Sequence, residues 1–409
     1  MSSVAGIRLG SCFLRYGPQP GVPFVFFCRK SHSIADPRST NSGKLSSSCG
    51  LSTVAVQKRT KPFTVDLSEL SKEMDIVKSF RRTKRFITDS GLVKNILYGL
   101  DPWDHRTTPI IMECSPGPGV LTRALLDAGC NVVALEGNIK FLPGLKKLEQ
   151  DACGSLRVVH CDFFRLDPDT ENVVDAPSMF SNDLMERLGI DEVPWDAGIP
   201  MKVFGILSYE KERLLLWRYI YALYERLSIF RYGRIEFNFF MSETLYKSLI
   251  TKPGDFKRYR ALAVLCHLAF DIQLLHKEHV STFSSSKKFK GPSIVNSGES
   301  LRDYLCLVRL TPRRNLFSEH FPPCDGKMFI NMVKQCLAKR KSRIITNLDS
   351  WSPGDGEQLL QLLDLPANAM TGDICPEDYK LLFELLTHSE DFSQSFVFET
   401  CENLPSFAF

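Results

Sequence analysis

A glycine-containing loop between an apolar run and an amphipathic run constrains the fold more than any other feature of the sequence. The apolar run 110–112 ends in Glu113, and the loop 114–119 contains Gly117 and Gly119. Beyond the loop, apolar residues recur with helical spacing as far as Gly129, a fitting helix stop. This order predicts a buried strand, a tight turn and a helix, the first unit of a doubly wound α/β sheet.

Further apolar runs along the chain repeat this strand-and-helix rhythm. The predicted strand at 131–135 is followed by Glu136, and the one at 157–161 is followed by Asp162. Residues 201–207 form a fourth predicted strand. The fold class is therefore α/β, with a doubly wound (Rossmann-like) parallel sheet. Residues 322–390 look helical, which predicts a second, smaller helical domain.

The acidic residues at the strand ends predict a nucleoside-binding edge, because the carboxyl ends of parallel strands converge. Glu136 can accept hydrogen bonds from ribose hydroxyls, and Asp162 can accept one from an adenine amino group. Two alternatives remain at this point: a purely structural strand–helix turn, and a nicotinamide dehydrogenase. A dehydrogenase prefers Gly or Ala at the third position of its loop, where this chain has Thr122.

Composition shifts divide the 409 residues into four expected parts. Residues 1–62 contain nine basic residues and one acid, a composition typical of a mitochondrial transit peptide and leader; a secretory signal or plain disorder are the alternatives. We expect an α/β domain at 63–315 with an irregular insertion at about 165–200, a helical nucleic-acid-binding domain at 316–390, and an acidic tail at 391–409.

Cysteine spacing and hydropathy exclude several other classes. The 13 cysteines include no CxxC pair and no zinc-like cluster, so we expect no metal site and a reducing compartment. No apolar run approaches the roughly 20 residues that span a bilayer, so we expect no membrane partner.

Basic residues gather in one stretch near the C-terminal end. Residues 302–343 contain ten Lys or Arg against three acids, and the densest run comprises Lys339, Arg340, Lys341 and Arg343. Such a cluster can contact several phosphates, although a solvated helix end has the same composition. Residues 364–409 contain nine acids and one base, and we expect that strip to face a basic partner or solvent.

These residues resemble the rRNA adenine N6,N6-dimethyltransferases, a class I S-adenosylmethionine methyltransferase family. Residues 84–89 stand where the family has Gln-Asn-Phe-Leu-x-Asp, and residues 113–122 match its glycine loop except that Ser115 replaces the first glycine. The resemblance implies S-adenosyl-L-methionine as cofactor. The implied cofactor-binding residues are Ile87, Ser115, Gly117, Gly119, Glu136 and Asp162.

The catalytic tetrapeptide departs from the family. Where the family has Asn-(Leu/Pro)-Pro-(Tyr/Phe), this chain has Ile206, Leu207, Ser208 and Tyr209. The family's asparagine accepts a hydrogen bond from the target amine, which Ile206 cannot do, while Ser208 retains a backbone carbonyl and Tyr209 can still stack on a base. We therefore assign no catalytic residue with certainty and expect weak methyl transfer at most.

Because it lacks the tetrapeptide, this chain resembles the mitochondrial branch of the family that works with the mitochondrial RNA polymerase. That resemblance implies a transcription initiation factor that helps to melt promoter DNA in the mitochondrial matrix, at the nucleoid. The alternative is an active enzyme that dimethylates two adjacent adenosines in a small-subunit mitochondrial rRNA hairpin.

Overall fold

The computed structural model describes residues 67–79, 84–100, 109–170, 174–285 and 303–387. All of them belong to one compact unit, Lys58–Phe409. The predicted leader at 1–62 and the predicted tail at 391–409 lie outside the described residues.

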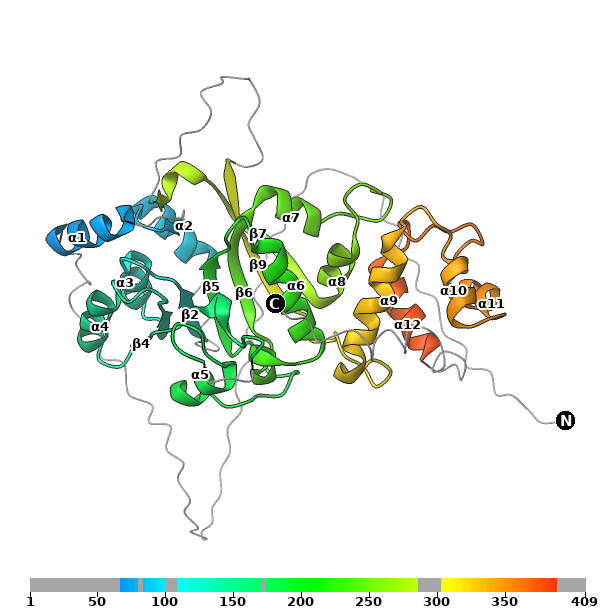
Figure 1. Ribbon diagram of the computed structural model, residues 1–409, viewed down its shortest axis with the longest axis horizontal. Helices are drawn as coiled ribbons and strands as arrows, with labels where there is room; N and C mark the ends of the chain where they lie inside the picture. Colours follow the sequence, from blue (N-terminus) through cyan, green and yellow to red (C-terminus); the bar gives the residue numbers. More distant parts are fainter. Residues whose placement is uncertain (1–66, 80–83, 101–108, 171–173, 286–302, 388–409) are drawn as a thin grey trace, which may run out of the picture. The chain divides into compact units, whose positions relative to one another are not determined.

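A seven-stranded mixed sheet forms the centre of this unit (Figure 1), in the order β4-β3-β2-β5-β6-β9-β7. The first five strands in that order are parallel, and β9 is antiparallel to both of its neighbours. The strands are β2 (Ile110–Cys114), β3 (Val132–Leu135), β4 (Leu156–Val159), β5 (Met201–Ile206), β6 (Glu236–Ser242), β7 (Phe270–His279) and β9 (Tyr304–Pro312). The doubly wound α/β fold predicted from the sequence is confirmed.

Helices cover both faces of the sheet (Figure 1). The helices of the described residues are α1 (Leu67–Lys78), α2 (Ser90–Leu100), α3 (Val120–Asp127), α4 (Leu142–Asp151), α5 (Ser181–Leu188), α6 (Glu212–Tyr224), α7 (Glu243–Leu249), α8 (Ala261–Ala269), α9 (Gly326–Ala338), α10 (Ile345–Trp351), α11 (Gly356–Leu362) and α12 (Pro376–Leu386). Of these, α10 and α11 lie away from the sheet, at the right of Figure 1.

Successive strand residues point into two separate apolar cores, as a buried parallel sheet requires. In β5, Val203 belongs to the core beneath α6, α8 and α9, whereas Phe204 belongs to the core beneath α2, α3 and α4. Phe239 and Phe240 of β6 divide in the same way.

The segment 165–200 is more ordered than expected, because it contains helix α5. Leu184, Met185 and Leu188 are buried on one side of that helix, and Gly189 ends it with a φ of 65°. Prolines before and after the helix hid this short apolar face in the sequence. The prediction of an irregular segment was wrong at these eight residues.

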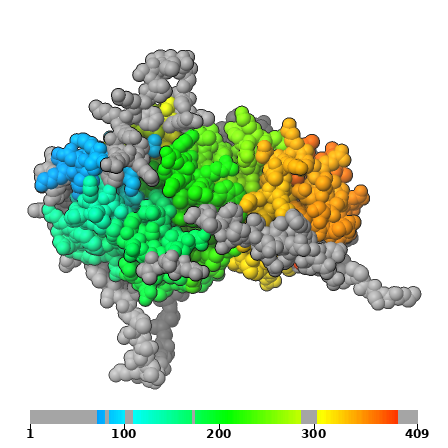
Figure 2. Space-filling model, viewed as in Figure 1, coloured from blue at the N-terminus to red at the C-terminus, as the bar shows by residue number. Residues whose placement is uncertain are grey.

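The C-terminal helices pack directly on the sheet unit. Tyr224 at the end of α6 lies 5.7 Å, between ring centroids, from Phe329 of α9. Phe329 in turn lies 5.0 Å from Phe321 and 5.3 Å from Phe383 of α12. The surface is accordingly continuous between the green sheet region and the orange helices in Figure 2.

A small two-stranded sheet brings two distant segments together beside the glycine loop. Strand β1 (Arg85–Phe86) pairs antiparallel with β8 (Ser284–Ser285). Thr88 and Ser284 are also hydrogen-bonded through their hydroxyls. Within the described ranges, no helix is long and apolar enough to cross a membrane, and no three metal-ligating side chains converge.

Candidate functional site

The glycine loop after β2 has a left-handed backbone at three positions. Ser115, Gly117 and Gly119 have φ values of 55°, 58° and 70°. A Cβ atom on Gly117 would lie 2.3 Å from a ring carbon of Phe86, so only glycine fits beneath that ring. The loop therefore has the conformation that lets a backbone approach a ligand closely.

The buried carboxyl of Glu113, just before the glycine loop, is hydrogen-bonded to the helix that follows the loop. Glu113 is 3% exposed and accepts a hydrogen bond of 2.6 Å from the hydroxyl of Thr122 in α3. Burial raises the pKa of Glu113 to about 7, and the Thr122 bond opposes that rise. Because Thr122 is needed as a donor here, its presence at the third loop position has a structural reason.

Glu136, at the end of β3, faces the same loop. Its carboxylate accepts hydrogen bonds from the backbone amides of Gly117 (3.0 Å) and Asn138 (2.7 Å), one on each oxygen. Each oxygen therefore keeps a further acceptor position, which two vicinal ribose hydroxyls could use. Burial raises the pKa of Glu136, and the two amide bonds oppose the rise.

Asp162 lies beside Glu136, after the end of β4. One of its oxygens accepts from the amide of Phe164 at 3.1 Å, and the side chain is half-buried. A Cβ atom on Gly137 would lie 3.1 Å from the Cβ of Asp162, so the two strand ends meet closely. Ile87 is buried next to Phe86 in the core under α2, so only its backbone could meet a ligand at this edge.

The tetrapeptide that differs from the family's motif, residues 206–209, lies at the end of β5, the neighbour of β2. Ile206 is half-buried and packs against the same core as Phe204. Leu207 is buried, and its amide donates to the carbonyl of Phe240 at 2.9 Å. Tyr209 is 46% exposed, which leaves ring surface that a base could contact.

The Ser208 carbonyl, which the sequence suggested could still receive the target amine, is already used. It accepts from the amides of Lys211 (2.9 Å) and Glu212 (2.8 Å) at the start of α6. A carbonyl oxygen has two lone pairs, so both acceptor positions are filled. The Ile206 side chain has no hydrogen-bond acceptor, and the Ser208 carbonyl has no unused lone pair. Neither group can therefore accept a hydrogen bond from a target amine.

Two charged residues at this edge were not singled out by the sequence analysis. Glu212 is buried and accepts from both the amide (2.9 Å) and the hydroxyl of Ser242. Burial raises the pKa of Glu212, while the Ser242 bonds and the positive charge of Arg85 lower it. Arg85 stands within the segment that resembles the methionine-end motif, and this is the one signal that could have indicated it.

The basic run is a turn, which corrects the expectation that this part of the segment 322–390 is helical. Helix α9 ends at Ala338, where the Lys339 carbonyl accepts from the amide (2.9 Å) and hydroxyl (2.6 Å) of Ser342. Lys339, Lys341 and Arg343 are exposed. Arg340 is half-buried, and its Nε donates to the Phe256 carbonyl at 2.7 Å.

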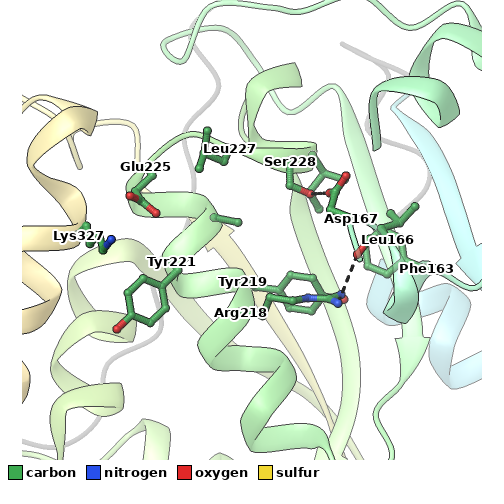
Figure 3. A pocket seen from close by; sticks show the side chains of 12 residues that line it. Phe163, Leu166, Asp167, Arg218, Tyr219, Tyr221, Glu225, Leu227, Ser228 and Lys327 are labelled. Atoms are coloured by element: carbon green, nitrogen blue, oxygen red, sulfur yellow. Dashed lines mark hydrogen bonds between the residues drawn. The ribbon is translucent and has the colours of Figure 1, made fainter. Parts of the chain in front are cut away.

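A separate apolar pocket of about 310 Å³ lies between η1 (Phe163–Arg165), the end of α6 and the start of α9 (Figure 3). Arg218 donates to the Leu166 carbonyl at 3.4 Å, and the Ser228 hydroxyl bonds to Asp167. Of the site residues predicted from the sequence, none lines this pocket in the described part of the chain.

Comparison with known proteins identifies the family of the chain. A family model described as ribosomal RNA adenine dimethylase matches residues 78–388. The chain belongs to this family.

Two known proteins are similar to this chain over most of its length. "Dimethyladenosine transferase 2, mitochondrial" of Mus musculus is 40% identical over 320 residues, covering 78% of this chain and 81% of that protein. The Homo sapiens protein of the same name is 36% identical over 324 residues, covering 78% and 82%. Among solved structures, a dimethyladenosine transferase from Plasmodium falciparum is similar with a TM-score of 0.47 and 12% identity, covering 73% of this chain and 95% of that one.

The residues at the strand edge fit S-adenosylmethionine. The left-handed loop and the half-buried Asp162 are compatible with such a ligand, whereas Glu136 is 1% exposed and would have to become accessible before a ribose could bind it. The contacts of the cofactor's methionine end would fall to the segment that contains Arg85 and Ile87, and Phe86 already covers Gly117 there.

Proposed function

We propose that this protein is a mitochondrial transcription initiation factor that acts with the mitochondrial RNA polymerase in promoter melting. Its partners are then the polymerase and promoter DNA, and its compartment is the mitochondrial matrix, at the nucleoid. Relatives named as mitochondrial, matching about four fifths of the chain, support the compartment.

The state of the tetrapeptide is the observation on which this proposal rests. Ile206 packs into an apolar core, and the Ser208 carbonyl is used by α6. An amine placed there would lose its hydrogen bonds, which costs about 1–3 kcal/mol, or roughly a tenfold to hundredfold loss of rate. A fold that keeps an exposed aromatic ring, Tyr209, beside a tetrapeptide without its acceptors is suited to holding an unpaired strand.

Promoter-dependent transcription on linear duplex DNA tests the proposal. We expect purified mitochondrial RNA polymerase to need this protein for initiation. Equal initiation by the polymerase alone would contradict the proposed function.

The second candidate is methylation of two adjacent adenosines in a small-subunit mitochondrial rRNA hairpin, and the intact nucleoside edge favours it. Ile87, Ser115, Gly117, Gly119, Glu136 and Asp162 would hold S-adenosyl-L-methionine, which supplies the methyl group. In this chain Glu136 and Asp162 would orient the nucleoside, and Tyr209 would stack on the target base.

Replacement of the lost amide separates the two candidates. If the missing acceptor limits the chemistry, Ile206→Asn raises methyl transfer from labelled S-adenosylmethionine to the hairpin by tenfold or more. Ile206→Val, which keeps an apolar side chain, is the matched control and leaves transfer unchanged. A wild-type rate already comparable with that of Ile206→Asn would place the enzyme activity first.

For either candidate, Lys339, Arg340, Lys341 and Arg343 are the proposed nucleic-acid contacts. Three of the four are exposed, while Arg340 chiefly holds the turn against Phe256. We therefore expect Lys339, Lys341 and Arg343 to contribute most of the salt-dependent affinity.

A further inference from the structure

We infer that the loop 250–260 and the turn 339–343 form one binding surface for the sugar–phosphate backbone of single-stranded nucleic acid. The inference rests on the proposed function. It extends that function by adding a loop that is distant in sequence from the basic residues already proposed as nucleic-acid contacts. Figure 1 shows the loop after α7 reaching toward the α9–α10 turn.

Backbone contacts fix the two segments against each other. The Arg340 Nε donates to the Phe256 carbonyl at 2.7 Å. Gly254 donates its amide to the Gly372 carbonyl at 2.9 Å, and Gly372 donates to the Arg340 carbonyl at 2.8 Å. A Cβ atom on Gly372 would lie 2.7 Å from the Phe256 ring and 2.9 Å from the Arg340 carbonyl, so the strip 370–373 packs tightly against both the loop and the turn. The surface is thus preformed, which reduces the entropy lost on binding.

The joined segments are strongly basic. The loop contains four basic residues and one acid, the turn contains four basic residues and no acid, and the adjoining strip 370–373 adds Asp373. The basic residues are Lys252, Lys257, Arg258, Arg260, Lys339, Arg340, Lys341 and Arg343, and all except Arg340 are exposed. Eight positive charges therefore stand against two negative ones.

Most of these charges are available to a ligand. Arg258 pairs with Asp255 at 2.8 Å. Among the residues that the structure describes, no carboxylate lies within 4 Å of the side-chain nitrogens of the other seven. Asp373 stays near Gly254, at the side of the surface. An anionic polymer fits this surface better than a protein of mixed charge.

An aromatic ring of the loop lies beside the basic turn and favours a single strand. Phe256 is half-buried and, with residues 338–342, lines a shallow depression. The Lys341 Nζ lies 5.9 Å from the centre of its ring. Phosphate contacts flanking a stacking ring are the arrangement of single-strand-binding grooves, where an unpaired base can reach the ring. A duplex keeps its bases stacked on each other and could use only the charges.

Helix α7 connects this surface with the tetrapeptide edge. Its N-cap, Ser242, bonds to Glu212, four residues after Ser208. Its other end leads directly into the loop 250–260. Seven helical residues span about 10 Å, so the start of the loop and the contact of Ser242 with Glu212 lie about that far apart.

Salt-dependent binding of a 20-nucleotide single strand, followed by fluorescence anisotropy, tests the inference. The loop variant is Lys257→Gln with Arg260→Gln, the turn variant is Lys341→Gln with Arg343→Gln, and the control is Lys72→Gln with Lys94→Gln. Each phosphate contact contributes about 0.7 to the slope of log K against log salt for single strands. We expect the loop and turn variants each to lose about 1.4 from that slope and to bind about tenfold more weakly, while the control stays like wild type.

A loop variant that binds like the control while the turn variant is impaired would overturn the joint surface. A loop variant impaired only for duplex, or impaired only for an acidic polypeptide such as polyglutamate, would overturn the single-strand assignment. The readout does not involve the polymerase, so failure of the transcription assay would leave a positive result here intact. Phe256→Leu keeps an apolar side chain in the depression and should weaken single-strand binding about fivefold without changing the slope; unchanged affinity would remove the ring from the surface.

Discussion

At the residue scale, the glycine loop has a serine in a left-handed backbone conformation that favours glycine. Ser115 has a φ of 55°, a conformation in which a Cβ atom is disfavoured by about 1–2 kcal/mol. The sequence indicated that serine replaces glycine here, but the left-handed backbone at that position came only from the structure.

Ser115→Gly should raise the free energy of unfolding by up to about 1 kcal/mol, because it relieves the strain of that backbone. Urea denaturation gives the comparison. Ser248→Gly, in the helical backbone of α7, is the opposite control and should lower stability by about 1 kcal/mol. A destabilised Ser115→Gly would show that the serine is not strained.

Glu113 makes the stability of this protein fall as the pH rises. Its folded pKa of about 7 exceeds the ordinary value of 4.5, so the native state holds a proton that the unfolded chain has already lost. The resulting penalty is absent below pH 4.5, grows between pH 4.5 and 7, and is complete above pH 7. A difference of this size corresponds to roughly 3 kcal/mol.

Glu113→Gln keeps an acceptor for Thr122 and removes the ionisation. We expect its stability relative to wild type to increase steadily between pH 4.5 and 7 in urea titrations, and then to stay constant. A difference from wild type that does not vary with pH would contradict the elevated pKa.

Glu136 and Asp162 could be predicted from their positions after apolar runs, because parallel strands bring their ends together. Arg85 and Glu212 could not, because their proximity depends on the pairing of β1 with β8 and on the Ser242 bonds. The sequence also could not show that the Ser208 carbonyl is occupied, since this requires the start of α6 to be known.

At the scale of elements, periodicity was a reliable guide wherever an element is long or fully buried. The expected strands at 110–113 and 201–207 match β2 and β5 within one residue. Helix α5 was not predicted, because its buried face comprises only a few apolar residues in a segment flanked by prolines. The sequence predicted helix across the basic run as part of residues 322–390, whereas the Lys339 carbonyl accepts from Ser342 and Thr371 and α9 ends at Ala338.

Ser242 couples two elements, so its loss should be costly. Its hydroxyl donates to the buried Glu212 and accepts from the Leu245 amide as the N-cap of α7. We expect Ser242→Ala to reduce the free energy of unfolding by about 1–3 kcal/mol. Ser248→Ala, in the same helix, should change it by less than about 0.5 kcal/mol. Equal effects of the two substitutions in thermal melts would argue against the coupling.

At the scale of the whole molecule, one apolar core extends from the sheet into the C-terminal helices. Phe329 is fully buried there, among Tyr224, Phe321 and Phe383. The sequence predicted a separate helical domain from its composition, and that division stays a prediction. The shared core favours cooperative unfolding of both parts.

Phe329→Ala should therefore lower the stability of the sheet and the helices together, by about 3–5 kcal/mol in a single calorimetric transition. Leu362→Ala is the control, because Leu362 is 59% exposed on α11 and should matter little. Two separate transitions, with only one shifted by Phe329→Ala, would show that the helical part unfolds independently.

We propose above that this methyltransferase fold serves chiefly to hold an unpaired strand during initiation. The most direct measurement compares transcription by the mitochondrial RNA polymerase on closed linear duplex and on a template already melted at the start site, each with and without this protein. The account predicts a strong requirement for the protein on the closed duplex and little requirement on the melted template. Equal initiation with and without the protein on closed duplex would contradict it.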